Sequence, residues 1–432
     1  MAEQTKTDTQ YTTLEEWIQQ EVIPFSVDSD ESLNAAVDQL ITSLDDSVEL
    51  LGLGEPTHMI EDFLILRNRL FQRLVEAHGY TAIAIESSFP KSHLANAYIT
   101  GQSAASLDEV LEKGFSHNFG RMPANRALIE WMRQYNADPV HQTKIHFYGF
   151  DSPTEMYGTD SPRQSLEFVL DYLASVGMPN VQQLRQRIDA LIGEDAAWEN
   201  PETLRDSSRS IGLSPAAVEL RIETEELITD LLLRRPQWVA NGGQDRFLEA
   251  VQFATVARQL LTYHAGLARE TEGRFIRLME IRDAMMADIL SSIVLRERSR
   301  GKVLAFAHNS HLKRGRSEWL FGEQLNIWWP AGAHLADMLG ERYVMIGVGV
   351  GASDAMNIGQ PEPATLEAAL TASAGPVRFI PTHSDEVLPA ALIADLPTRS
   401  ATPQYFPLDA NSFTDYDWIC VLDTAVQFVQ IW

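Results

Sequence analysis

Two short segments of the chain combine histidine with carboxylate, amide or hydroxyl side chains. The first, Gly-Glu-Pro-Thr-His, places Glu55 three residues before His58. The second, His-Asn-Ser-His, runs from His308 to His311. A histidine titrates near neutral pH, and it can take a proton from water at one ring nitrogen while a carboxylate holds the other. The two segments therefore predict acid–base chemistry on a water molecule.

Short apolar runs come directly before several ionisable residues. The runs ELLGLG, TAIAI, IHFYGF and VLAFA are followed at once by Glu55, Glu86, Asp151 and His308. Strands this short that are apolar throughout indicate a parallel sheet covered by helices on both faces. Such sheets bind ligands outside the carboxyl ends of their strands. We expect Glu55, Glu86 and His308 to share one site there, and we interpret Asp151 as an ordinary polar residue after a strand.

One arginine is predicted to lie in the core beside this site. Arg67 lies four residues after Phe63 and three before Leu70, within an apolar stripe at helical spacing. A buried guanidinium needs partners, because breaking a buried ion pair costs roughly 3–5 kcal/mol. Glu55 and Glu86 are the predicted partners. The alternative is that the aliphatic stem of Arg67 crosses the core and its charged head reaches solvent at the helix end.

The order of the apolar runs predicts an α/β fold with a mainly parallel central sheet covered by helices. Residues 1–154 would form the first part of this core and residues 301–432 the second. Strand-like runs in the second part lie at 303–307, 343–350, 376–380 and 418–422. Residues 155–300 read as successive helices, which predicts a large helical insertion that caps the active cleft. Near the N-terminus, a capping box at Thr13 predicts a helix through about Ile23 that Pro24 ends.

Composition and charge exclude several classes of partner. The net charge of −26 argues against duplex nucleic acid and anionic membranes as partners. Cys420 is the only cysteine, so neither an intrachain disulfide nor a cysteine-based zinc site can form. The polar N-terminus lacks the apolar segment of a secretory signal, and no apolar run approaches the ~18–20 residues of a membrane span. We expect a cytoplasmic protein that acts on a small molecule.

Absent motifs narrow the chemistry. The sequence contains no His-Glu-x-x-His, no Gly-x-Ser-x-Gly, no P-loop and no Gly-x-Gly-x-x-Gly. This argues against a serine esterase of the α/β-hydrolase type. We expect no cofactor and no bound metal, but the alternative of a metal-dependent hydrolase stays open, because Glu55, His58, His308 and His311 are ligand types that Zn, Mn or Fe accept. Of the other histidines, four are interpreted as structural or exposed and two are left unassigned. The four are His78, His93, His141 and His146, and the two are His117 and His334.

At these residues the sequence resembles a known family. The segment LGLGEPTHMIEDFLILRNRLFQRLVEAHGYTAIAIES is similar to the signature of the erythromycin esterases, in which Gly-Glu-x-x-His is followed by an acidic residue, an arginine and a glutamate at the end of the next strand. The segments IHFYGFD, RDAMMADIL, FAHNSHLKR and AGAHLADMLGERYVMIGVGVG follow in the family's order. The resemblance covers roughly residues 45–350.

The resemblance implies a carboxylic ester hydrolase that opens the macrolactone of an antibiotic such as erythromycin and thereby inactivates it. It implies that His58 is the general base, that Glu55, Glu86 and Arg67 position the water, and that the two histidines of the second segment contribute to the site. Arg67 or one of those two histidines would stabilise the oxyanion. Met59 departs from the family, which usually has a small residue there. The fold also resembles a haem-binding group, so a non-catalytic haem- or small-molecule-binding protein is a further alternative.

Overall fold

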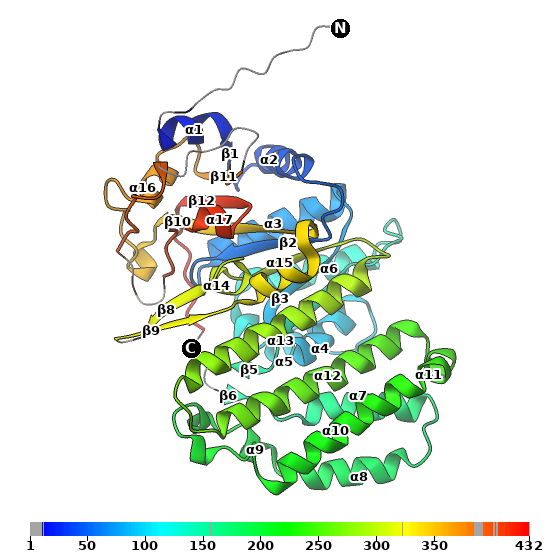
Figure 1. Ribbon diagram of the computed structural model, residues 1–432. Coiled ribbons are helices and arrows are strands. Elements are labelled where there is room, and N and C mark those ends of the chain that lie inside the picture. The colour runs from blue at the N-terminus through cyan, green and yellow to red at the C-terminus, as the bar shows by residue number, and fades with distance from the viewer. Residues whose placement is uncertain are drawn as a thin grey trace, which may run out of the picture.

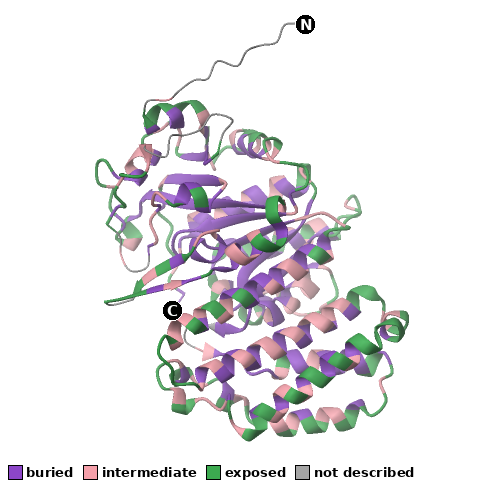
Figure 2. Cartoon of the chain, in the orientation of Figure 1, coloured by how far each residue is buried: buried purple, intermediate pink, exposed green. Residues whose placement is uncertain are grey.

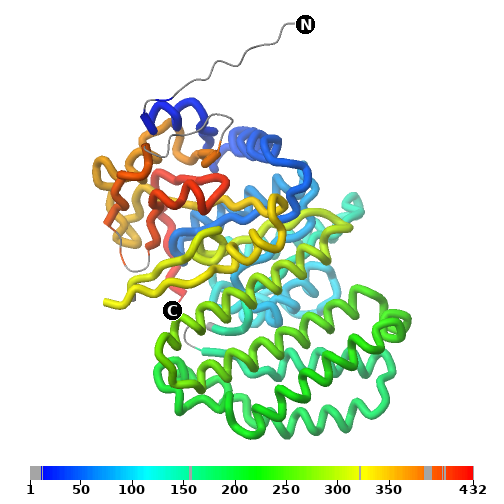
Figure 3. Tube along the Cα trace, in the orientation of Figure 1, coloured from blue at the N-terminus to red at the C-terminus, as the bar shows by residue number. Residues whose placement is uncertain are grey.

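The computed structural model describes residues 11, 13–155, 158–321, 323–383, 392–400, 402 and 405–431. In the view of Figure 1, the sheet and its flanking helices fill the upper part of the molecule, and a block of helices fills the lower part. Figure 3 follows the chain by colour: the first and last thirds lie together around the sheet, and the middle of the chain forms the lower block.

One eight-stranded sheet forms the centre, in the order β1-β11-β12-β10-β2-β7-β3-β4. The six strands from β12 to β4 pair in parallel, whereas β11 is antiparallel to both of its neighbours. The strands are β1 (Ile23–Phe25), β2 (Leu50–Glu55), β3 (Tyr80–Ser88), β4 (His146–Asp151), β7 (Lys302–His308), β10 (Tyr343–Ala352), β11 (Val377–Pro381) and β12 (Trp418–Thr424). The predicted fold, α/β with a mainly parallel central sheet, is confirmed.

Each face of the sheet carries its own hydrophobic core, because side chains alternate along a strand. In β3, Ala82 and Ala84 belong to one core, and Ile83 and Ile85 belong to the other. The strands are buried along nearly their whole length, as the purple ribbons in Figure 2 show. The core that contains Ile83 lies against α2 (Asp30–Thr42), α3 (Glu61–Ala77), α5 (Leu107–Lys113) and α6 (Pro123–Ala137).

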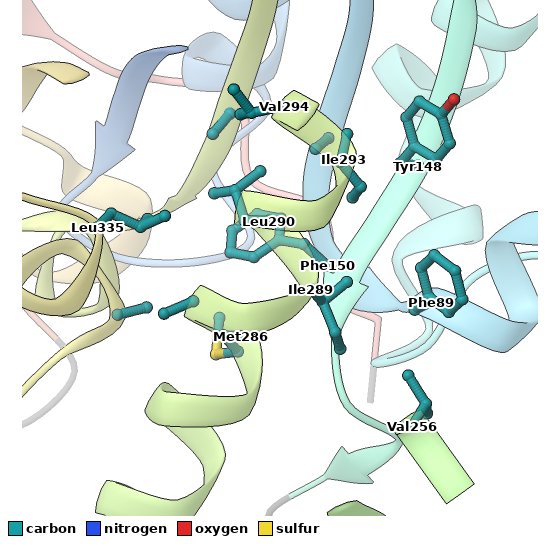
Figure 4. Close-up of a cluster of buried hydrophobic side chains, with 14 of the residues drawn as sticks. Phe89, Tyr148, Phe150, Val256, Met286, Ile289, Leu290, Ile293, Val294 and Leu335 are labelled. Carbon is teal, nitrogen blue, oxygen red and sulfur yellow. The ribbon is translucent and has the colours of Figure 1, made fainter. Parts of the chain in front are cut away.

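The other core joins the sheet to the block of helices. Figure 4 shows Met286, Ile289, Leu290 and Ile293 of one helix beside Phe150 of β4. These four residues recur at the three- and four-residue spacing of a buried helical face. The helix that carries them, α13, packs on both the sheet and α12 and so fixes the block to the sheet. The helices of the block are α7 (Arg163–Ser175), α8 (Val181–Ile192), α9 (Asp195–Trp198), α10 (Pro215–Leu233), α11 (Arg235–Gly242), α12 (Gln244–Leu267) and α13 (Arg274–Glu297).

The division into segments 1–154, 155–300 and 301–432 stays a prediction.

The shorter helices of the α/β part are α1 (Leu14–Glu21), α4 (Phe89–Ile99), α14 (Asn309–Leu312), α15 (Ala331–Leu339), α16 (Leu366–Thr371) and α17 (Ser412–Asp415).

Some elements differ from the sequence-based expectation. The N-terminal helix ends at Glu21 rather than near Ile23, because Ile23 precedes a proline and that position disfavours helical backbone. Ile23 instead begins β1. Two hairpins were not predicted; they consist of β5 (Thr154–Glu155) with β6 (Gly158–Thr159), and β8 (Ser317–Phe321) with β9 (Gln324–Trp328).

Candidate active site

Glu55 and His308 end neighbouring parallel strands at one edge of the sheet. In the register of β2 and β7, the Cα of Glu55 lies opposite that of His308. The chain leaves β2 toward β3 on one side and leaves β7 toward β10 on the other, so this edge is a topological switch point, where open α/β sheets bind ligands. The structure therefore brings the two histidine-containing segments together.

His58 lies on the loop between β2 and α3, where Glu55 orients it. Its Nδ1 lies 2.7 Å from Glu55 Oε1, and because a carboxylate only accepts hydrogen bonds, we assign the proton to Nδ1. The other nitrogen, Nε2, lies 4.0 Å from Glu86 Oε1. The side chain of His58 is 35% exposed, so this group is open to a ligand.

The residue after His58 adopts a left-handed conformation. Met59 has φ 70°, which a residue with a Cβ rarely adopts. The C-terminal tail pairs with this loop. The Val429 amide donates to the Met59 carbonyl at 3.0 Å, and the Glu61 amide donates to the Gln427 carbonyl at 2.7 Å. These bonds hold the loop that presents His58.

Glu86 lies at an irregularity near the end of β3. The register of β3 with β4 shifts between Ile85 and Ser88, and such bulges re-aim a side chain, often beside an active site. Glu86 Oε2 accepts the backbone N–H of His308 at 2.8 Å. Its other oxygen faces three cationic or titratable groups, which are Arg282 at 3.0 Å, His311 at 3.4 Å and His58 at 4.0 Å.

Arg282 of α13 is the cation at the centre of the cluster that Glu86, His58 and His311 form, and it was not among the predicted site residues. Its guanidinium donates to both carboxylate oxygens of Asp151, at 3.1 and 2.7 Å, and to Glu86. Asp151 is fully buried at the end of β4, so its interpretation as an ordinary polar residue was wrong. The sequence could have predicted that Arg282 is buried, since it lies four residues after Leu278 and four before Met286. This is the spacing of a buried helical face, on which the prediction for Arg67 also rested.

Arg67 is buried, as predicted, but its predicted partners are wrong. Its guanidinium donates to the side-chain oxygen of Asn68, at 2.7 Å from Nη2, and to that of Asn125 at 2.8 Å. It also lies over the Phe306 ring, 4.8 Å from the centroid. Among the described residues, no carboxylate lies within ion-pair distance of it. Arg67, Glu55 and Glu86 all line one cavity of about 20 Å³, which Met59 and Phe119 also line.

His308 has both ring nitrogens engaged inside the protein. Its Nε2 lies 3.2 Å from the Pro56 carbonyl and therefore carries the proton, whereas Nδ1 accepts hydrogen bonds from Ser310. Burial lowers the pKa of His308 to about 3, and the positive charge of His58 acts in the same direction. We conclude that His308 is a neutral group that fixes the His58 loop.

His311 is held by a buried aspartate that directly follows Arg282 in the sequence. Its Nδ1 lies 2.7 Å from Asp283 Oδ1, and Asp283 also accepts hydrogen bonds from the Trp328 indole at 2.9 Å and the Ala331 amide at 3.0 Å. Although burial lowers it, the charges of Asp283 and Glu86 raise the pKa of His311 above its usual value. Its other nitrogen faces Glu86 and Arg282.

The electrostatics of the cluster favour an ionised Glu86 and a strongly basic His58. Burial opposes the charged form of Glu86, but His311, His58 and Arg282 hold the pKa of its carboxyl well below the usual range. Burial also lowers the pKa of His58, yet the charge of Glu86 and the hydrogen bond with Glu55 raise it to about 9. Burial raises the pKa of Glu55, and the His58 contact offsets this only in part.

His117, which the sequence left unassigned, belongs to the same cluster. It lies on the segment between α5 and α6, and its Nε2 is 3.1 Å from Asp151 Oδ2. The Phe119 ring packs against both His117 and His58, with centroid distances of 5.3 and 5.5 Å. Glu55–His58 and Asp151–His117 are therefore two histidine–carboxylate pairs that flank one aromatic ring.

The metal-dependent alternative lacks a ligand set in the part of the chain that the structure describes. No three histidine, cysteine, aspartate or glutamate side chains converge there so as to hold a metal ion. Arg282 lies between Glu86 and Asp151, and it supplies the positive charge that these carboxylates need. His308, one of the four candidate ligands, has both nitrogens hydrogen-bonded.

No described helix is long and apolar enough to cross a membrane.

Comparison of the sequence with known proteins gives consistent matches. A family model described as erythromycin esterase matches residues 75–424, a range that begins after His58 and includes Glu86, Arg282 and His308. Erythromycin esterase type II of Escherichia coli is 25% identical over 342 residues, which are 77% of this chain and 76% of the relative. Erythromycin esterase type I of the same organism is 23% identical over 314 residues, which are 71% of each protein.

Solved structures share the fold at low identity. A Bacillus cereus protein superposes with a TM-score of 0.75 at 17% identity, covering 96% of this chain and 98% of its own. A succinoglycan biosynthesis protein gives 0.68 at 18% identity, with 96% and 97% covered. An erythromycin esterase mutant in its open conformation gives 0.65 at 18% identity, with 91% and 95% covered.

Proposed function

The chain belongs to the erythromycin esterase family, and from that premise we propose that it hydrolyses the lactone of a macrolide by direct attack of water. The coarser assignment to a family of hydrolases rests on the match over most of the chain. The choice of a macrolide is supported by the names of the two Escherichia coli relatives. Opening the ring would inactivate a macrolide antibiotic.

The single observation that carries the mechanism is the pairing of His58 with Glu55 opposite Glu86. The 4.0 Å between His58 Nε2 and Glu86 Oε1 is too long for a direct hydrogen bond and suits a water that contacts both atoms. In our proposal, His58 Nε2 takes a proton from this water while Glu55 holds Nδ1. The water oxygen then attacks the ester carbonyl carbon.

The charge that develops on the carbonyl oxygen needs a preorganised positive partner, usually the largest contribution to acyl-transfer catalysis. We assign this role to Arg282 and His311 rather than to Arg67 or His308. Arg282 is 12% exposed and His311 6%, and both contact Glu86 Oε1, the oxygen that His58 also faces. Arg67 is held by the side-chain oxygens of Asn68 and Asn125, and His308 is neutral.

A mass-spectrometric assay tests this function. We expect the protein to add the mass of one water to macrolides that contain an intact lactone, and to leave a matched macrocycle with an amide in place of the ester unchanged, since an amide is the harder bond to hydrolyse. In water labelled with heavy oxygen, one label should enter the new carboxylate. A panel of macrolides of different ring size that shows no hydrated product would contradict the proposal.

A further inference from the structure

The proposed role of His311 in stabilising the oxyanion requires that its ring stay in one orientation. An imidazole can turn about its Cβ–Cγ bond, and the hydrogen bond made at one nitrogen decides what the other nitrogen can do. Nε2 of His311 lies 3.4 Å from Glu86 Oε1, the oxygen that His58 also faces at 4.0 Å. The group that binds Nδ1 therefore decides whether Nε2 faces the reacting atoms.

We propose that Asp283 is a positioning residue that holds His311 in the orientation needed for catalysis. This inference rests on the proposed hydrolysis and adds to it a residue that acts only through another. Asp283 Oδ1 lies 2.7 Å from His311 Nδ1. With Nδ1 bound in this way, Nε2 is the nitrogen that faces Glu86 and the carbonyl oxygen of the ester.

The first observation is that Asp283 accepts hydrogen bonds on both of its carboxylate oxygens. Oδ1 accepts from His311 Nδ1 and from the Ala331 amide at 3.0 Å, and Oδ2 accepts from the Trp328 indole at 2.9 Å. The three donors come from α14, from the start of α15 and from the end of β9. They fix the plane of the carboxylate, and a carboxylate in a fixed plane fixes the imidazole that it binds.

The second observation is that His311 is the counter-charge of Asp283. The aspartate is fully buried, and among the described residues His311 is the one basic group within ion-pair distance of it. Arg282, the preceding residue, donates to Glu86 and Asp151 instead. A buried carboxylate is costly unless it is paired and hydrogen-bonded. An aspartate whose partner is a histidine of the site is therefore better explained by the site than by the fold.

The third observation is a close contact that fixes the surroundings of this pair. Ala331 begins α15, and Gly332 follows it. A Cβ at Gly332 would lie 1.9 Å from the carbonyl oxygen of Leu312, the residue after His311, so only glycine allows α15 to begin there. The helix start that donates to Asp283 and the short helix that carries His311 are thus packed directly against each other.

A double-mutant cycle tests whether Asp283 acts through His311. Asp283→Asn keeps the size of the side chain and removes its charge, and His311→Gln removes the ring. Glu297→Gln is the matched control, because Glu297 is also a fully buried carboxylate of α13 but contacts Thr81 and Tyr148. We would measure kcat and KM of the single and double variants on erythromycin, well below their melting temperatures.

We expect Asp283→Asn to lower kcat by ~10²–10³-fold, the usual loss for one oxyanion donor, with KM changed by less than about threefold. In the His311→Gln background the same substitution should lower kcat by less than about twofold, because the ring that Asp283 holds is absent. Glu297→Gln should stay within about twofold in both backgrounds. An equal loss of kcat from Asp283→Asn in both backgrounds, or no loss in either, would overturn the inference.

A second measurement needs no turnover and therefore applies to variants that are too slow to assay. In NMR spectra of protein with ¹³C-labelled histidine, the His311 signal is the one that His311→Gln removes. Burial lowers the pKa of His311, whereas the charges of Asp283 and Glu86 raise it above its usual value. Asp283→Asn should lower this pKa, since Glu86 and Arg282, the other charges that face the ring, stay in place. An unmoved pKa of His311 would contradict the inference.

A milder variant covers the case in which Asp283→Asn does not fold. Trp328→Phe removes only the indole donor to Asp283 Oδ2 and should lower kcat by about tenfold or less, a loss that also disappears in the His311→Gln background. A loss that persists there would overturn the inference. A His58→Gln variant with wild-type turnover would instead contradict the proposed function, and the pKa of His311 would still test Asp283.

Discussion

Helix α13 carries two buried ionic clusters that use the same strands and differ in what surrounds them. Toward its beginning, Arg282 joins Glu86 and Asp151, at the carboxyl ends of β3 and β4. At its last residue, Glu297 accepts hydrogen bonds from Thr81 at 3.0 Å and Tyr148 at 2.7 Å, nearer the beginnings of the same two strands. Both carboxylates, Glu86 and Glu297, are buried.

The difference lies in the partners and their exposure. Glu297 is satisfied by two hydroxyl groups and by Arg300 at 3.3 Å, and it is fully enclosed. Glu86 faces histidines, which can change protonation, and one of them, His58, is 35% exposed. A buried charge by itself therefore does not mark an active site. It does so when a titratable partner connects it to solvent.

The largest expected effect is on catalysis at the cluster around Glu86, which His58 connects to solvent. His58→Gln should lower kcat on a macrolide substrate by ~10²–10⁴-fold, the usual contribution of a general base, and should also lower the melting temperature near neutral pH, because the contacts with Glu55 and Glu86 that raise the pKa of His58 also stabilise the folded state. Steady-state kinetics and thermal melts measure the two. Near-wild-type turnover would reject His58 as the base.

The next effect compares the two buried arginines near the site. Arg282→Met leaves the Glu86 and Asp151 carboxylates without their main cation and should lower the free energy of unfolding by roughly 3–5 kcal/mol. Arg67→Met leaves only neutral amide oxygens of asparagines unsatisfied and should cost about 1–3 kcal/mol. Denaturant titrations of both variants measure these values. Equal losses in the free energy of unfolding would mean that Glu86 and Asp151 share another cation.

We expect the enclosed cluster around Glu297 to affect stability and not catalysis. Glu297→Gln replaces a fully enclosed carboxylate that accepts hydrogen bonds from Thr81 and Tyr148, so we expect a loss of about 1–3 kcal/mol in the free energy of unfolding. The value of kcat, measured well below the melting temperature, should stay within about twofold of wild type, since Glu297 lies at the far ends of these strands. A fall in kcat comparable to that of His58→Gln would remove the contrast between the two clusters.

The smallest expected effect is a shift in the pH dependence of kcat/KM, which His58 sets in the cluster around Glu86. A base with its pKa raised to about 9 acts only when deprotonated, so kcat/KM should rise with pH toward that value. Glu55→Gln weakens the hydrogen bond that raises the pKa of His58, and it should move this rise to lower pH. The contribution of His58 to stability has the opposite sign. It is complete below about 6.5 and is lost as pH increases through about 9. A pH profile that Glu55→Gln leaves unmoved would argue that another group limits the rate.

The local pattern of the sequence was sufficient to predict most strands of the sheet and the site residues that directly follow them. Seven apolar runs predicted seven strands of the sheet, because a strand buried on both faces needs apolar residues throughout. The ionisable residue that follows a run, such as Glu55 or His308, then falls at the strand end. Short elements without such a run were not predicted, and β1 and the β8–β9 hairpin are examples.

The sequence by itself determined where the strands end, that Arg67 is buried and that Glu55 precedes His58, because these properties depend on spacing along the chain. Only the tertiary structure decided which cation meets which carboxylate. Arg282 is 196 residues from Glu86 and 131 from Asp151, and the packing of α13 on the sheet brings them together. Arg67, much closer in sequence to both Glu55 and Glu86, lies on asparagines instead. Proximity in sequence does not fix the direction of a side chain. The partner of a buried charge is therefore the group that tertiary packing places beside it.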